Sequence, residues 1–229
     1  MARNHDYKVL LLTSLPDIMD NITAITRKHF ATVESLYWQM GNKETKSGVL
    51  GQIEASGYDL IISYVSNIIL QPRHLAQTSF GAVNIYPAPP EHPGAWGFYC
   101  QPAIRRSVRC HHGVTLHEIN EKIDAGPIYA VERWPVGEND SIKSVLKKSM
   151  ERCAAMLEFT VKTLADSSNG SKCFERIDEH WDAANGRHGI ADVQAWFRDL
   201  DPGHPAHNEH IVLNHPGAIM APPYFSDLT

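Results

Sequence analysis

Four short segments with the pattern of β-strands, all within the first 85 residues, constrain the fold of this 229-residue chain more than any other feature. Three of them are apolar enough to be buried on both faces of a sheet. The four segments span residues 7–13, 32–38, 58–64 and 81–85. Helices are expected between them at residues 14–29, 44–56 and 72–78. This alternation predicts an α/β fold in which helices flank a mostly parallel, twisted sheet.

The alternation stops after Ile85, where residues 86–94 contain four prolines. Such a segment can be neither a helix nor a central strand. A rigid loop that directly follows a central parallel strand lies where open α/β sheets place their binding sites. Beyond it, a helix at 95–106, two strands at 113–119 and 128–135, and a long amphipathic helix at 141–164 are expected.

The charge distribution divides the chain into two parts. Residues 1–170 have no net charge, whereas residues 171–229 carry the whole net charge of −5 and are rich in His and Pro. We therefore expect a catalytic domain at 1–170 and a small C-terminal extension at 171–229 that packs on it. The negative charge argues against a nucleic-acid partner. No apolar run is long enough to span a bilayer and no secretion signal opens the chain, so a cytoplasmic protein without a membrane partner is expected.

Two segments, residues 84–94 and 113–128, carry the candidate chemistry. The first begins with Asn84 at the end of a strand, and the second combines Gly-Val-Thr-Leu-His117 with Asp124-Ala-Gly-Pro-Ile. Together they resemble the formyltetrahydrofolate-dependent formyltransferases, which act on glycinamide ribonucleotide, methionyl-tRNA and sugar amines. The resemblance spans residues 7–164 and implies a Rossmann-like formyltransferase fold, although no Gly-rich dinucleotide fingerprint is present. It also implies N10-formyltetrahydrofolate as cosubstrate. Because residues 171–229 are acidic where tRNA would need positive charge, a small-molecule amine is the expected acceptor, and we expect no metal.

The candidate catalytic residues are Asn84, Tyr86, His117 and Asp124. An amide such as that of Asn84 can donate a hydrogen bond to the oxyanion formed when an amine attacks the formyl carbon. Asp124 can orient a partner or help remove the amine proton, and His117 can point into the same site from a strand. Each residue alone also has an ordinary structural explanation, as a turn former or a packed histidine.

Tyr86 departs from the family pattern, because the resemblance implies a catalytic His two residues after the Asn. A Tyr hydroxyl can donate to an oxyanion, but with a pKa of about 10 it is a poor base at neutral pH. Two hypotheses stay open. Either Asn84, Tyr86 and Asp124 still transfer formyl, or the chain is a folate-binding relative or a formyltetrahydrofolate hydrolase that has lost the catalytic His.

The resemblance also implies where the substrates bind. Two loops would read the pterin, chiefly through main-chain groups: residues Ile68, Ile69 and Leu70, and residues Ile119, Asn120, Glu121 and Ile123. His92 and Arg105 are candidates for acceptor binding, and Trp181, Trp196 and Phe197 are expected to dock the extension near the acceptor pocket. The acceptor can be a sugar nucleotide amine, an amino acid or another metabolite amine. The oligomeric state is not readable, a homodimer being one option.

Overall fold

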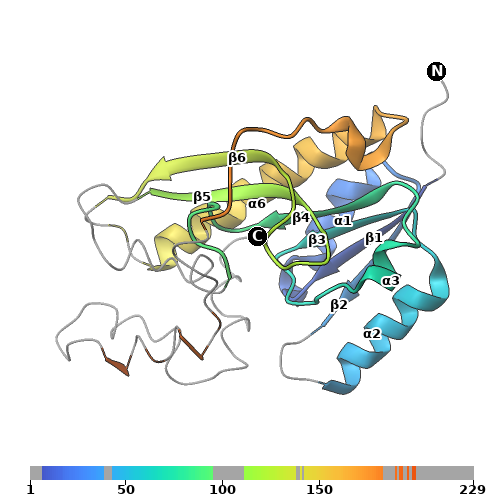
Figure 1. Cartoon of the computed structure of the whole chain (residues 1–229), viewed down its shortest axis with the longest axis horizontal. Helices are drawn as coiled ribbons and strands as arrows, with labels where there is room; N and C mark the ends of the chain where they lie inside the picture. The colour runs from blue at the N-terminus through green and yellow to red at the C-terminus, as the bar shows by residue number, and fades with distance from the viewer. Residues whose placement is uncertain are drawn as a thin grey trace.

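The computed structural model describes residues 7–38, 43–94, 111–137, 140, 142–182, 189, 191–192, 195 and 198–199. Six strands form one sheet in the order β2-β1-β3-β4-β5-β6 (Figure 1). The strands are β1 (Lys8–Thr13), β2 (Thr32–Tyr37), β3 (Leu60–Tyr64), β4 (Gly81–Tyr86), β5 (His111–Glu118) and β6 (Ile128–Pro135). The first four pair in parallel, and β5 is antiparallel to both β4 and β6. The predicted α/β fold with a mostly parallel sheet is confirmed.

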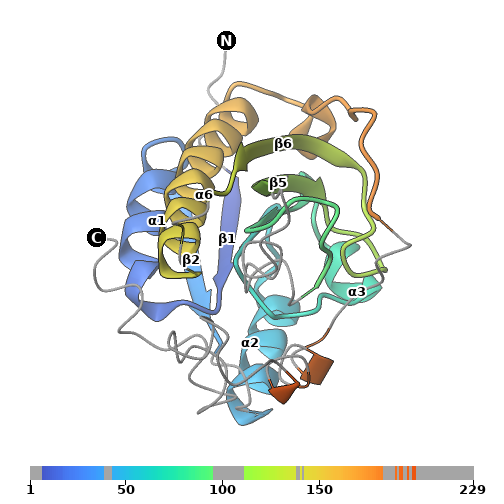
Figure 2. The same cartoon turned by 90° about the vertical axis from the view of Figure 1, so that its left-hand side faces the viewer.

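Helices cover both faces of this sheet. The α-helices are α1 (Met19–Arg27), α2 (Lys43–Ser56), α3 (Pro72–Leu75) and α6 (Ile142–Ala165), and the 3-10 turns are η1 (Pro16–Ile18) and η2 (Gly170–Cys173). Helices α1 and α6 lie side by side on one face, with α2 on the other (Figure 2). None of the helices in the described part of the chain combines the length and apolarity needed to cross a bilayer.

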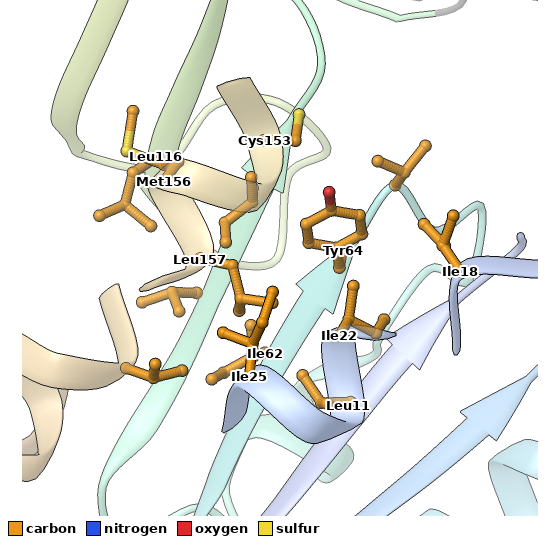
Figure 3. Close-up of a cluster of buried hydrophobic side chains, with 14 of the residues drawn as sticks. Leu11, Ile18, Ile22, Ile25, Ile62, Tyr64, Leu116, Cys153, Met156 and Leu157 are labelled. Atoms are coloured by element: carbon orange, nitrogen blue, oxygen red, sulfur yellow. The ribbon is translucent and has the colours of Figure 1, made fainter. Parts of the chain in front are cut away.

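Alternate residues of the buried strands feed two separate cores. Leu11 of β1 and Ile62 of β3 face the α1–α6 layer, where they pack with Ile22 and Leu157 (Figure 3). Leu10 and Leu12 point to the opposite face and pack against α2. Because side chains alternate along a strand, each of these strands contributes to both cores. Both of its faces are therefore buried, as the continuous apolar runs predicted.

The helix expected from residue 14 begins later than predicted, because Ser14 has another role. The chain forms η1 first and becomes α-helical at Met19, while the Ser14 hydroxyl accepts a hydrogen bond from the amide of Asn67 at 3.0 Å. Ser14 thus joins the loops that follow β1 and β3. These loops lie at the carboxyl edge of the sheet, where α/β proteins place their sites.

The hairpin of β5 and β6 extends beyond the end of β4 and supports the proline-rich loop. Thr115 of β5 lies opposite Tyr86, the last residue of β4, and its hydroxyl donates to the carbonyl of Ala88 at 2.7 Å. Further along, the His112 Nε2 lies 3.1 Å from the Pro87 carbonyl. Burial lowers the pKa of His112 to about 3, so this ring is neutral and donates as N–H.

Residues 171–182, here called the strap, connect the end of α6 to the proline-rich loop. The amide of Ile177 donates to the carbonyl of Ile128, the first residue of β6, at 3.0 Å. Arg133 of β6 holds the Glu179 carboxylate through two hydrogen bonds of 2.8 Å, and the amide of Asp182 donates to Pro90 at 3.1 Å. The strap therefore follows the outer strand β6 toward the carboxyl end of β4 (Figure 1).

Candidate active site

Asn84 and His117 form a pair at the centre of the site. They lie directly opposite each other on the neighbouring antiparallel strands β4 and β5. The amide nitrogen Nδ2 of Asn84 lies 2.9 Å from the imidazole Nε2 of His117. His117 is buried, with 3% of its surface exposed. The sequence pointed to both residues, and the register of β4 against β5 brings them together.

The other ring nitrogen fixes the tautomer of His117. Nδ1 lies 2.8 Å from the carbonyl oxygen of Glu118, which can only accept, so Nδ1 carries the hydrogen. Nε2 then presents a lone pair that accepts a hydrogen bond from the Asn84 amide. Burial lowers the pKa of His117, although the charge of Asp124 and the Glu118 carbonyl both act to raise it. His117 is therefore neutral at neutral pH, with its lone pair toward Asn84.

This arrangement leaves the amide oxygen of Asn84 buried. Among the described residues, Asn84 Oδ1 has no hydrogen-bond partner. A buried acceptor without a partner costs about 1–3 kcal/mol, and such groups in native proteins commonly await a ligand or a water. Oδ1 can accept from the N–H of a bound molecule, and the second hydrogen of Nδ2 can donate to a bound oxygen.

Asp124 lies in the turn between β5 and β6, where it contacts the proline-rich loop and influences His117. Its backbone is left-handed, with φ +47°, which Asp tolerates better than most residues. The carboxylate Oδ2 accepts a hydrogen bond from the amide of Gly94 at 2.9 Å, while its charge acts on His117. The turn is pressed against β5 so closely that a Cβ on Gly126 would lie 1.9 Å from the Glu118 carbonyl oxygen.

Tyr86 lies two residues after Asn84, and its hydroxyl is engaged with the proline-rich loop. The hydroxyl oxygen lies 2.5 Å from the carbonyl oxygen of His92 and 2.6 Å from that of Gly94. A phenol has one hydrogen, and here it is donated to these carbonyls. His92 itself is held by a hydrogen bond from its amide to Pro89. Hydrogen bonds with the Tyr86 hydroxyl and the Asp124 carboxylate thus hold the end of this loop in place.

The two loops expected to bind the pterin share one buried cluster. Ile68 and Leu70 are buried in it, and Ile119 packs against it from the other loop. Ile69 and Ile123 are 45% and 37% exposed, so they present apolar surface to solvent. The main-chain groups of Ile69 and Leu70 take part in none of the hydrogen bonds formed within the described residues.

The second loop is stabilised from within, and several other candidates lie elsewhere. Asn120 Oδ1 accepts from the amide of Lys122 at 2.9 Å, and Glu121 is exposed. Arg105, the helix expected at 95–106, Trp196 and Phe197 lie outside the described residues. His111 at the start of β5 is exposed, and its neighbour His112 is buried.

Trp181 is a contact of this site that the motif spacing did not reveal. We expected it to dock the extension; in the structure its ring centroid lies 4.8 Å from that of His117 and 5.8 Å from that of Tyr86, both edge to face. Its indole N–H donates to the carbonyl of Gly126 at 2.9 Å. The only signal in the sequence was a large aromatic residue in a polar segment, 55 residues beyond Gly126.

Val65, just beyond β3, holds an unusual backbone conformation at the same edge. Its φ is +48°, which is a genuine outlier for a β-branched residue. Its amide donates to Ile85 of β4 at 3.3 Å, and its carbonyl accepts from Ser14 at 3.2 Å. Val65 thereby links the ends of three neighbouring strands, and strain of this kind is concentrated at functional sites.

Comparison with known proteins shows a match over most of this region. The family model described as formyl transferase matches residues 3–158. A methionyl-tRNA formyltransferase from Treponema pallidum is 31% identical over 96 residues, which is 42% of this chain and 30% of that protein. The match thus spans about a third of the length of the curated relatives.

Solved structures share the fold at low sequence identity. A sugar N-formyltransferase from a Shewanella species is 20% identical with a TM-score of 0.64, over 87% of this chain and 83% of that one. The formyltransferase PseJ from Anoxybacillus kamchatkensis gives 19% and 0.59, over 86% and 93%. Phosphoribosylglycinamide formyltransferase from Streptococcus pneumoniae gives 21% and 0.54, over 69% and 98%.

Proposed function

The chain belongs to the formyl transferase family, and on this premise we propose that it transfers the formyl group of N10-formyltetrahydrofolate to the amine of a small-molecule acceptor. The observation that carries the proposal is the Asn84–His117 pair at the carboxyl end of β4, with a neutral imidazole and an amide oxygen that has no partner among the residues the structure describes. In this pair Asn84 supplies a hydrogen-bond donor and a hydrogen-bond acceptor, and His117 supplies a base next to them.

The pair accounts for each movement of atoms in the reaction. The amine nitrogen forms a bond to the formyl carbon, and the carbonyl electrons move to oxygen, where an N–H of Asn84 stabilises the charge. Asn84 Oδ1 accepts a hydrogen bond from the amine. When Nδ2 turns toward the oxyanion, the Nε2 lone pair of His117 is freed to take the amine proton. The carbonyl then reforms, the bond between the carbon and N10 breaks, His117 passes the proton it took to N10, and tetrahydrofolate leaves.

Asp124 supports this proton transfer by its charge. A carboxylate near the imidazole favours the protonated ring that forms during the reaction, as its upward effect on the pKa of His117 indicates. In this proposal His117 provides the base that the family pattern places at position 86. Tyr86 fastens the proline-rich loop, since its hydroxyl already donates to His92 and Gly94.

Several relatives support folate as the formyl donor. PseJ was solved with tetrahydrofolate, and another sugar formyltransferase, WlaRD, with 5-N-formyl-THF. The main-chain groups of Ile69 and Leu70, which form no hydrogen bond within the described part of the chain, and the exposed side chains of Ile69 and Ile123 suit a flat ring with polar edges.

We propose a sugar nucleotide amine as the acceptor. PseJ was solved with a UDP-linked formamido sugar and WlaRD with dTDP. A tRNA acceptor is disfavoured because the extension at 171–229 carries the chain's net negative charge, whereas tRNA binding requires positive charge.

The test is incubation of the full chain with N10-formyltetrahydrofolate and a panel of sugar nucleotide amines, amino acids and metabolite amines. Mass spectrometry should detect the gain of one formyl group on an acceptor. Asn84→Ala should lower turnover by about two orders of magnitude, the typical effect of losing one oxyanion donor. Asn169→Ala makes the same chemical change before η2, away from the site, and should leave turnover unchanged.

Other outcomes would identify other functions. Heat stabilisation by folates without formyl transfer would favour a folate-binding relative. Release of formate without any acceptor would favour a hydrolase. An Asn84→Ala variant with the turnover of the parent on the true acceptor would contradict the proposed role of the pair.

A further inference from the structure

We propose that Trp181 is a positioning residue, which excludes water from His117 and fixes its ring so that the imidazole stays neutral and directed at Asn84. This inference rests on the proposed function, because it gives the strap a role in the chemistry of the same site. It also makes the base dependent on a residue outside the segment that the family model matches, residues 3–158.

The geometry shows how one side chain reaches both halves of the site. The Trp181 ring meets the rings of His117 and Tyr86 edge to face, with centroids 4.8 and 5.8 Å away. Edge-to-face contact is a favourable arrangement for aromatic rings and fixes their mutual orientation. His117 is already held in the ring plane by Asn84 and Glu118, and Trp181 adds the contact from outside the sheet.

Trp181 is itself held in place by a hydrogen bond, so its ring can form a fixed cover over His117. Its indole N–H donates to the carbonyl of Gly126 in the turn that carries Asp124. On either side along the strap, Glu179 is held by Arg133 and the amide of Asp182 is held by Pro90. With these three hydrogen-bonded contacts, we expect the Trp181 side chain to keep its position when substrates bind.

Water exclusion is the effect that matters for the base. Burial is the largest influence on the pKa of His117, and it acts downward. Among the described residues, the charge that acts on the ring is that of Asp124 on the turn; Tyr86 of β4 contacts Trp181, and His180 and Asp182 are the neighbours of Trp181 along the strap. Of these, the charge of Asp124 acts upward, so exposing the ring to water would let the pKa rise.

The test follows the titration of His117 by NMR in the full chain, with Trp181→Leu as the variant. The pKa of His117 should rise by at least about one unit, since water would replace an apolar cover. Phe174→Leu is the control, because it removes an aromatic ring of the same strap that stacks on Tyr129 of β6 and does not contact His117. In the control the titration should match that of the parent.

Turnover gives a second readout. In Trp181→Leu, kcat should fall about tenfold or more, the KM for formyl-folate should stay unchanged, and the acid limb of the kcat profile should move to higher pH. An equal loss in Phe174→Leu would mean that Trp181 only docks the strap, and would overturn the proposal.

The titration separates this proposal from the proposed function. If no acceptor is found but the His117 pKa rises in Trp181→Leu, the positioning role stands and the proposed reaction fails. If the pKa is unchanged in a folded Trp181→Leu chain, the positioning role fails whatever the enzyme does. Should that variant not fold, Trp181→Phe removes one of the two indole rings and the bond to Gly126, which opens part of the cover over His117; a titration identical to the parent's would then overturn the proposal.

Discussion

His117 determines how the site works, because burial and two neighbouring groups together set its protonation state. Burial lowers its pKa below the usual value of about 6.5, whereas Asp124 and the Glu118 carbonyl raise it. A base with a lowered pKa stays available as the pH falls. The kcat of the parent enzyme should therefore be constant from neutral pH down to below about 6.5, and decline only where the ring becomes protonated.

Asp124→Asn tests the electrostatic part of this balance. Removing the charge removes an upward influence on the pKa of His117, so the acid limb of the kcat profile should move to still lower pH. Turnover at neutral pH should fall, because the protonated ring formed in the reaction loses its stabilising neighbour. The measurement is the pH dependence of kcat, with Asp166→Asn at the exposed end of α6 as the control. A limb that moves to higher pH would contradict the assignment.

Val65 allows a prediction about stability at the same scale. Left-handed backbone costs an ordinary residue about 1–2 kcal/mol, so Val65→Gly gains relief from strain while losing a buried side chain. We expect the unfolding free energy to change by less than about 1.5 kcal/mol. Val83→Gly, in a regular and fully buried strand position, gains no such relief and should lose more than about 2 kcal/mol. Denaturant unfolding of both variants measures the difference, and equal losses would argue against strain at Val65.

At the scale of elements, the proline-rich loop depends on the strands that flank it. Tyr86→Phe removes the hydroxyl that contacts the His92 and Gly94 carbonyls, at a cost of about 1 kcal/mol. Hydrogen exchange of the backbone amides of Glu91, His92 and Gly94 should accelerate, and the KM for the acceptor should rise. Tyr64→Phe is the control, because that hydroxyl has only a long 3.5 Å contact with Met150. If Tyr86 is instead an oxyanion donor, kcat should fall about 10²-fold with the loop unchanged.

The elements could be predicted from the sequence better than their side-chain contacts. The strands β1 and β3 followed from continuous apolar runs, and the loop after β4 followed from its prolines. The pairing of Asn84 with His117 depends on the register of β4 and β5. Apolar patterning shows which face of a strand a side chain occupies, but it does not show which residue lies opposite it on the next strand. The position of Trp181 depends on contacts across 55 residues of chain, about which local propensity says nothing.

The site is assembled from distant parts of the chain that meet at one edge of the sheet. Ser14 and Val65 join the ends of β1, β3 and β4, while β5, β6 and the strap close the opposite side. The strap belongs to this assembly rather than to a separate tail. Phe174 stacks on Tyr129 of β6 at 5.3 Å, and the amide of Ser171 donates to Phe80 at 2.7 Å, next to the start of β4.

Two truncations should separate the contribution of the strap from that of residues 183–229. A chain ending at residue 182 keeps Phe174, Glu179 and Trp181 with their contacts, so its melting temperature should stay within a few degrees of the parent's. A chain ending at residue 170 exposes Tyr129 and His117 and should lose at least about 2 kcal/mol, the scale of burying one large apolar side chain. For a chain of this size, that corresponds to a decrease in melting temperature of about 4 °C or more. Calorimetry measures both, and NMR of the shorter chain should show His117 titrating at higher pH. Equal melting temperatures for the two truncations would mean that the strap adds nothing to the fold, and that the site forms on β4 and β5 without it.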